Sequence, residues 1–236
     1  MADTNAQVRA PRSLSQQAHR RLIGVLGLLL PFLLYVLSAS RPTAGLPAWD
    51  VLPSVSAYYY TGAVGIFVGV LFALSLFLFT YQGYQGERAD RVLGAIGGAS
   101  ALGVALFPTR VPPTQPADRI AAPTWWTEAF HDIHLASAVA LFIVFILFAV
   151  WLFRKSAVPR ADRPTDKVWR DRFCLGCGVV MIVAVVWAVA ANVAERSIFW
   201  QEGAAIMAFA LSWLAKGEAY QPIVSAARSV RRFMAR

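Results

Sequence analysis

The chain has 236 residues, of which 58% are hydrophobic, 13% aromatic and only 15% charged, and its mean hydropathy is +0.53. A soluble protein of this size would need more polar surface to cover its core, so the composition indicates a membrane protein. The net charge of +9 does not indicate nucleic-acid binding, because the basic residues lie in short segments between apolar runs and form no mixed aromatic and basic surface.

The N-terminal region divides into a basic arm and a first apolar run. Residues 1–21 are polar and basic, which predicts a mobile cytoplasmic arm, and residues 22–38 then form an unbroken apolar run. An arm and run of this kind can also be a cleaved signal peptide. The run is longer than a usual signal-peptide core, so we expect an uncleaved first transmembrane span.

Five more apolar runs follow, and each is close to the ~20 residues that cross a ~30 Å hydrocarbon core. In lipid the backbone must satisfy its own polar groups, and the runs lack the alternation of a β-barrel, so they predict helices. The sequence therefore predicts an all-α bundle of six transmembrane helices within residues 22–218, followed by a basic cytoplasmic tail at 219–236. The predicted spans are 22–38, 62–81, 92–107, 135–153, 178–194 and 198–215.

The distribution of lysine and arginine predicts the orientation. Of the 22 basic residues, 18 fall in the N-terminal arm, the second-to-third and fourth-to-fifth connections and the C-terminal tail. The other four face the opposite side of the membrane: Arg41, Arg110, Arg119 and Arg196. Both termini are therefore expected in the cytoplasm.

Polar residues suited to chemistry are predicted at the non-cytoplasmic rim. His131 and His134 lie three positions apart at the entry to the fourth span, so on a helix they project about 60° from one another. Glu202 lies one turn inside the sixth span, where a carboxylate is costly unless it is paired or functional. Imidazole and carboxylate groups together suit zinc or iron, so His131, His134 and Glu202 are candidate metal ligands.

Two simpler interpretations compete with a metal site at this rim. The histidines can hydrogen-bond to Glu202, Glu195 or the tyrosines at 58–60 and so fix the helix ends, which is the interpretation that paired histidines favour by themselves. Alternatively the rim forms a pocket for a polar ligand or a lipid headgroup. The tyrosines themselves are expected mainly to anchor the second span at the headgroup level, with inward binding as the alternative. The candidate pocket residues are Tyr58, Tyr60, His131, His134, Glu195 and Glu202.

Small residues indicate where helices approach closely. Gly65-x-x-x-Gly69 and Gly94-x-x-x-Gly98 predict that the second and third spans pack intimately, with a contact to a second copy or to a partner complex as the alternative. Cys174 and Cys177 begin the fifth span, without a further Cys or His cluster near them in the sequence. We expect this pair to fill space at a helix end.

Several short motifs together resemble a group of bacterial six-span membrane proteins known only as a domain of unknown function. They are Ser56–Tyr60, Val68-Gly69, Tyr81–Tyr84, Ala105–Thr109, Ile133-His134 and Ser212–Glu218. The layout is more distantly similar to the Frag/DRAM/Sfk family of eukaryotic membrane proteins, in which a histidine opens the fourth span and a glutamate lies near the start of the sixth. By position, His134 and Glu202 match those residues.

This resemblance implies lipid-related work in a bacterial inner membrane and implies no defined catalytic chemistry. We therefore expect a non-catalytic protein that binds a lipid or small ligand at the periplasmic rim, with membrane lipids as its partners and no cofactor. Two alternatives remain open. One is a zinc- or iron-dependent membrane enzyme acting on lipid headgroups, and the other is an accessory subunit of a larger membrane complex.

Overall fold

A computed structural model of the chain describes residues 15–40, 51–83, 88–111, 123–156, 159 and 162–219. These residues form six α-helices and two short 3-10 helices and contain no strand, which confirms the predicted all-α class. The elements are α1 (Gln16–Ser40), η1 (Ser56–Tyr60), α2 (Val64–Phe79), α3 (Arg88–Leu106), α4 (Glu128–Val150), η2 (Leu152–Arg154), α5 (Thr165–Val193) and α6 (Phe199–Lys216). Most of the predicted tail at 219–236 and most of the predicted arm lie outside the described residues.

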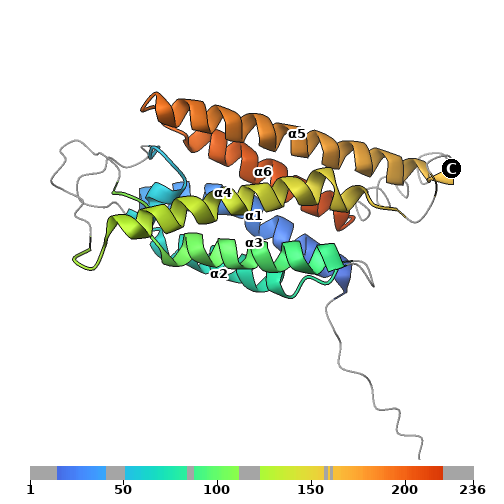
Figure 1. The fold of residues 1–236 in the computed structure, drawn as a ribbon, viewed down its shortest axis with the longest axis horizontal. Coiled ribbons are helices and arrows are strands. Elements are labelled where there is room, and N and C mark those ends of the chain that lie inside the picture. Colours follow the sequence, from blue (N-terminus) through green and yellow to red (C-terminus); the bar gives the residue numbers. More distant parts are fainter. Residues whose placement is uncertain are drawn as a thin grey trace, which may run out of the picture.

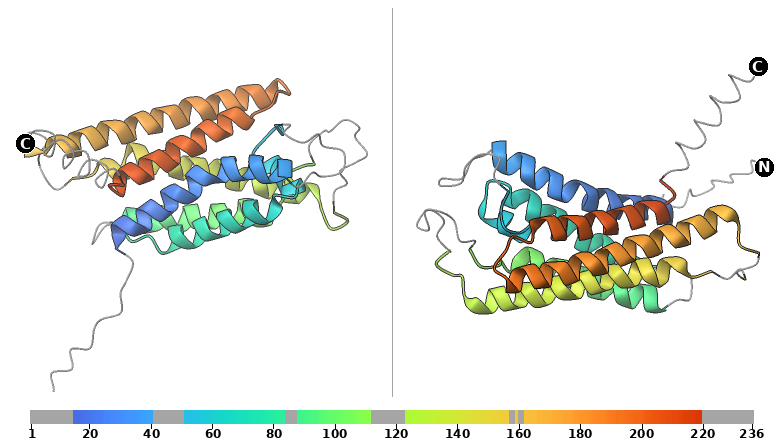
Figure 2. Two further views of the ribbon diagram at one scale, coloured as in Figure 1. Left: turned by 180° about the vertical axis from the view of Figure 1, so that it is seen from behind. Right: turned by 90° about the horizontal axis from the view of Figure 1, so that it is seen from above.

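The six described helices form a closed ring, in which each helix packs against its neighbours in the sequence and α6 returns to α1 (Figures 1 and 2). They run alternately between two ends of the bundle. We call the end that carries η1 and the start of α4 the His134 end. The other end carries the starts of α1, α3 and α5, and we call it the basic end.

Four of the helices in the described part of the chain are long and apolar enough to cross a membrane, namely α1, α3, α4 and α5. The α2 helix is apolar but has only 16 residues, or ~24 Å of helix. The α6 helix has 18 residues and carries Gln201, Glu202 and Lys216 near its ends. The structure thus shows several membrane-compatible helices, and the count of six spans remains a prediction.

Four helices begin a turn or more before the predicted apolar runs, namely α1, α3, α4 and α5. The α1 helix begins at Gln16, where its side-chain amide donates to the carbonyl of Gly83 over 2.9 Å. The α5 helix begins at Thr165, 13 residues before the predicted span at 178, and Lys167 pairs with Asp171 one turn further along it. Charged residues spaced four apart support a helix without adding apolar character, so hydropathy alone does not detect this extension.

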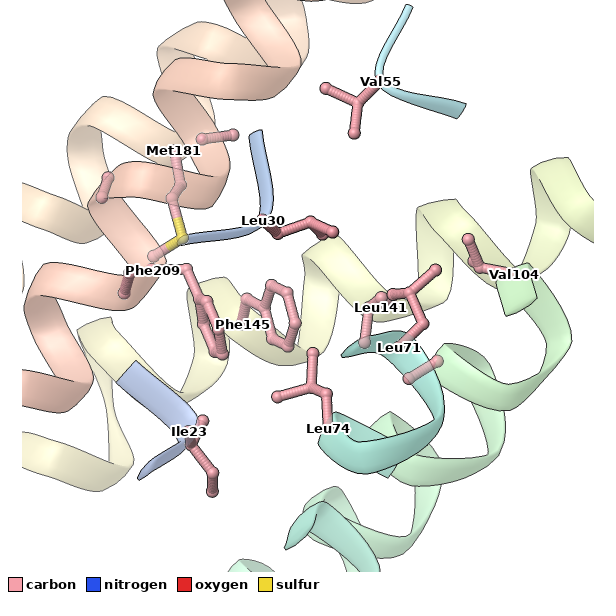
Figure 3. Packing of buried hydrophobic residues seen from close by; sticks show 14 of the residues in the cluster. Ile23, Leu30, Val55, Leu71, Leu74, Val104, Leu141, Phe145, Met181 and Phe209 are labelled. Atoms are coloured by element: carbon pink, nitrogen blue, oxygen red, sulfur yellow. The ribbon is translucent and has the colours of Figure 1, made fainter. Parts of the chain in front are cut away.

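The interior of the ring is filled by apolar side chains from all six helices (Figure 3). At its centre the rings of Phe145 on α4 and Phe209 on α6 stack with their centroids 3.6 Å apart. Towards the basic end Trp213, which has no exposed surface, is surrounded by Tyr81, Phe148 and Phe153. Aromatic packing therefore joins α4 and α6 to η2 and to the segment that follows α2.

The predicted close packing of the second and third spans is confirmed, with the α3 glycines in the contact and Gly65 and Gly69 outside it. A Cβ on Gly98 would lie 2.8 Å from the Phe79 ring, and one on Gly94 would lie 2.7 Å from the carbonyl oxygen of Leu78. Only glycine allows α2 and α3 to approach this closely at these positions. Gly65 and Gly69 meet nothing within 4 Å, because they lie on a face of α2 that no described residue covers.

The two cysteines lie inside α5, well after its start at Thr165 rather than at the helix end as predicted, and both are buried and unlinked. The thiol of Cys174 lies 3.8 Å from the carbonyl oxygen of Ser212 on α6. The Cys174 side chain therefore fills space between α5 and α6.

Candidate ligand site at the His134 end

The segment 51–61, which includes η1, lies at the His134 end and is bonded to the start of α6. The backbone N–H of Val55 donates to Glu202 Oε2 over 2.6 Å. The carbonyl oxygen of Pro53 accepts both the N–H of Ile198 at 2.7 Å and the hydroxyl of Ser197 at 3.1 Å. Glu202 therefore has a specific structural partner, namely a backbone donor of this segment.

His134 connects the same segment to α3 and α4. Its side chain is buried, with 4% of its surface exposed. Nδ1 lies 2.6 Å from the carbonyl oxygen of Phe107, and Nε2 lies 2.9 Å from Ser56 Oγ. A carbonyl can only accept, so Nδ1 carries the proton and donates, and in the neutral ring Nε2 accepts the hydroxyl hydrogen of Ser56. Both ring nitrogens are thus engaged.

His131 occupies a different place from His134. Its ring is half-buried, and Nδ1 lies 3.2 Å from Thr109 Oγ1 and 3.3 Å from the backbone nitrogen of Arg110. Arg110 also pairs with Glu128, over 2.8 Å, with both side chains largely exposed. His131 and Glu128 therefore hold the segment that follows α3.

The tyrosines at 58–60 do not behave alike. Tyr59 and Tyr60 are half-buried, their rings pack edge to face, and the hydroxyl of Tyr60 donates to the carbonyl oxygen of Thr109. Burial raises the pKa of Tyr60 to about 12, with a further contribution from Tyr59. The neutral phenol that donates this hydrogen bond is therefore maintained at every physiological pH.

Tyr58 points inward, which is contrary to the expected anchoring role. None of its surface is exposed, and its ring lies against Phe199 of α6 with the centroids 5.7 Å apart. Burial raises the pKa of Tyr58, opposed by the nearby backbone N–H of Leu52. By distance and angle, the Tyr58 hydroxyl has no hydrogen-bond partner among the described residues. The Gln201 side-chain oxygen on α6 is likewise buried and unpartnered within them.

The structure brings some predicted site residues to the same segment and leaves others apart. His134 and Glu202 bind Ser56 and Val55, which are adjacent in the chain, although no hydrogen bond links the two side chains directly. Glu195 is exposed at the turn after α5, where its φ of 54° ends the helix in the left-handed region. Glu195 therefore makes no contribution to this cluster.

The predicted metal ligands are not gathered around one point. Within the described ranges, no three His, Cys, Asp or Glu side chains are placed to hold a metal ion. The acceptor nitrogens of His131 and His134 and one oxygen of Glu202 instead meet protein groups. The zinc or iron hypothesis therefore stays a prediction that these contacts do not support.

The chain matches no protein-family model, no curated protein and no solved structure in comparisons with each. The resemblance to bacterial six-span proteins therefore stays a prediction.

Sequence reasoning missed most of the partners at this end. They are backbone groups of Pro53, Val55, Phe107 and Thr109, together with the side chains of Ser56 and Gln201. Backbone donors and acceptors carry no residue-specific signal. Ser56 and Gln201 carried a weak sequence signal, because each lies within two positions of a predicted site residue, Tyr58 or Glu202.

Proposed function

We propose that the chain is a non-catalytic, six-span protein of a bacterial inner membrane that binds a lipid headgroup or a small polar ligand at the His134 end. Membrane insertion is supported by the outer face of α5, where Val183, Val186, Trp187 and Val189 are each about 60% exposed. A continuous apolar surface of this kind suits contact with lipid and is unfavourable in water.

Six crossings are supported by the path of the chain. Because α1 to α6 run alternately between the two ends of the bundle, α2 and α6 pass through the same layer as the four long helices. The segments at the basic end carry most of the described lysines and arginines, which favours a cytoplasmic location for that end and a periplasmic location for the His134 end.

The observation that carries the ligand proposal is the buried hydroxyl of Tyr58. A buried polar group without a partner costs ~1–3 kcal/mol, and native proteins generally supply it with water or a ligand. Two polar groups close to Tyr58 in the chain already have hydrogen-bond partners: the N–H of Val55 is bonded to Glu202 and the hydroxyl of Ser56 is bonded to His134. Among the described side chains at this end, the Tyr58 hydroxyl and the Gln201 oxygen are the buried groups without a hydrogen-bond partner.

The test is to identify and quantify molecules that copurify with detergent-solubilised protein, by mass spectrometry, in wild type and Tyr58→Phe. The substitution keeps the ring against Phe199 and removes only the unmatched hydroxyl, so we expect occupancy to fall about fivefold, the effect of one ~1 kcal/mol hydrogen bond.

Tyr59→Phe is the matched control, because Tyr59 is half-buried in the neighbouring position and should keep its occupancy. Thermal unfolding of all three proteins verifies that they fold equally. If Tyr58→Phe retains the same bound molecules at the same occupancy, the proposed site is wrong.

A further inference from the structure

At the basic end a cavity of about 530 Å³ opens between the end of α4, η2 and the first turns of α5. It lies at the opposite end of the bundle from Tyr58. Its lining combines one apolar and one basic group of side chains: Val150, Trp151, Val168 and Leu175 with Arg154, Lys155, Arg163 and Arg172, and a single acid, Asp171.

The lining has an excess of positive charge. Four cationic side chains face one carboxylate, and that carboxylate is shared, since Asp171 lies 3.3 Å from Arg163 Nη1 and also pairs with Lys167. Arg154 donates to the carbonyl oxygen of Val150 and keeps its charge. A cavity lined by more cationic than anionic side chains favours an anionic ligand.

The apolar part of the lining lies where a membrane surface would be expected. The α5 helix has 29 residues, or ~44 Å, which exceeds the ~30 Å hydrocarbon core and carries its first turns into the headgroup layer. Trp151 is 49% exposed and Trp169 is 50% exposed, as is typical of aromatic side chains at that level. The Lys155 ammonium lies 4.7 Å from the centre of the Trp151 ring.

We propose that this cavity binds the phosphate headgroup of an anionic phospholipid, with Arg154 and Arg172 contacting the phosphate and an acyl chain lying along Trp151 and Leu175. Basic pockets between transmembrane helices at the cytoplasmic surface suit such lipids. An apolar wall beside the cations distinguishes a lipid from a free phosphate, which would gain nothing from it. The inference requires membrane insertion but is independent of the Tyr58 site.

The test is a titration of the full-length, detergent-purified protein with phosphatidylglycerol or phosphatidylcholine of the same acyl composition, followed by native mass spectrometry. We expect the wild type to prefer phosphatidylglycerol. The double variant Arg154→Gln/Arg172→Gln should bind it about 25-fold more weakly, because each basic residue near an anionic surface contributes about fivefold.

The matched control is Arg88→Gln/Arg91→Gln, which removes the same charge from the start of α3 at the same end of the bundle but outside the cavity. It should bind phosphatidylglycerol like the wild type, and so should Tyr58→Phe. The inference would be overturned by equal binding of the two lipids, by equal losses of binding in the two arginine double variants, or by full displacement of the lipid by inorganic phosphate. Loss of binding in Tyr58→Phe would also overturn it, because the two sites would then be one.

Discussion

At the His134 end, polar side chains bond mainly to backbone groups of the segments 51–61 and 107–110, whereas at the basic end charged side chains bond to each other and to carbonyls at helix termini. Glu202 and His134 illustrate the first arrangement, since each meets a backbone group. Arg21, Arg154 and Lys216 illustrate the second, because all three donate to carbonyl oxygens at or near the ends of α4, η2 and α6.

This difference indicates how each end is stabilised. Bonds between a buried neutral or singly charged group and the backbone depend on geometry and are little affected by salt. The cations at the basic end lie where helix carbonyls converge, and they are favoured there by the helix dipoles. We therefore expect the His134 end to respond to deletion of single side chains, and the basic end to respond to ionic strength.

The largest expected effect is that of His134→Ala. It removes the bonds to Phe107 and Ser56 and leaves a small cavity, so the free energy of unfolding should fall by ~3 kcal/mol, as measured by denaturant titration in detergent. His131→Ala is the matched control and should cost less than ~1 kcal/mol, because that ring is only half-buried. Equal losses would contradict the separate roles of the two histidines.

A smaller effect is expected for Glu202→Ala, which leaves the N–H of Val55 without its acceptor and should cost ~2 kcal/mol in the same measurement. Glu202→Gln retains an oxygen that can accept this bond, so its loss should be below ~1 kcal/mol. If both variants were equally destabilised, the negative charge of Glu202 would matter more than the hydrogen bond, and a cation would have to be sought nearby.

The smallest effect is expected for Glu218→Gln at the basic end. Glu218 pairs with Arg170, and the two side chains are 20% and 15% exposed, so removing the charge should cost ~1 kcal/mol at low salt. Repeating the denaturant titration with urea at high salt should reduce this loss, because screening already weakens the pair in the wild type. The loss in His134→Ala should not change with salt. A Glu218→Gln effect that is independent of salt would remove the distinction between the two ends.

Much of the fold could be predicted from local pattern, and the errors have physical causes. The positions of α2, α3 and α4 follow the apolar runs within a few residues, apart from the first turns of α4, because a lipid-facing helix must be apolar over most of its length. The first 13 residues of α5 were missed because they are charged, and the packing of Gly65 and Gly69 was misassigned because spacing cannot show which face of a helix meets a neighbour.

The candidate site was predicted less completely than the fold. His134, Glu202 and Tyr58 were identified as unusual polar residues near an apolar boundary, but their partners were not. Tyr58 was expected mainly as a headgroup anchor and is fully buried. Glu195 was expected in the pocket and lies exposed at a turn. The cationic cavity beside Arg154 was not foreseen, because its residues are spread over 26 positions from Val150 to Leu175.

The sequence by itself determined the all-α class, the membrane-compatible helices and the concentration of basic residues in alternate connections, because hydropathy and charge are properties of each residue that add along the chain. Only the tertiary structure decided that Glu202 accepts from Val55, that His134 joins Phe107 to Ser56 and that the Tyr58 hydroxyl is unmatched. Each of these depends on the distance between segments remote in sequence, and that distance is set by the packing of the whole ring.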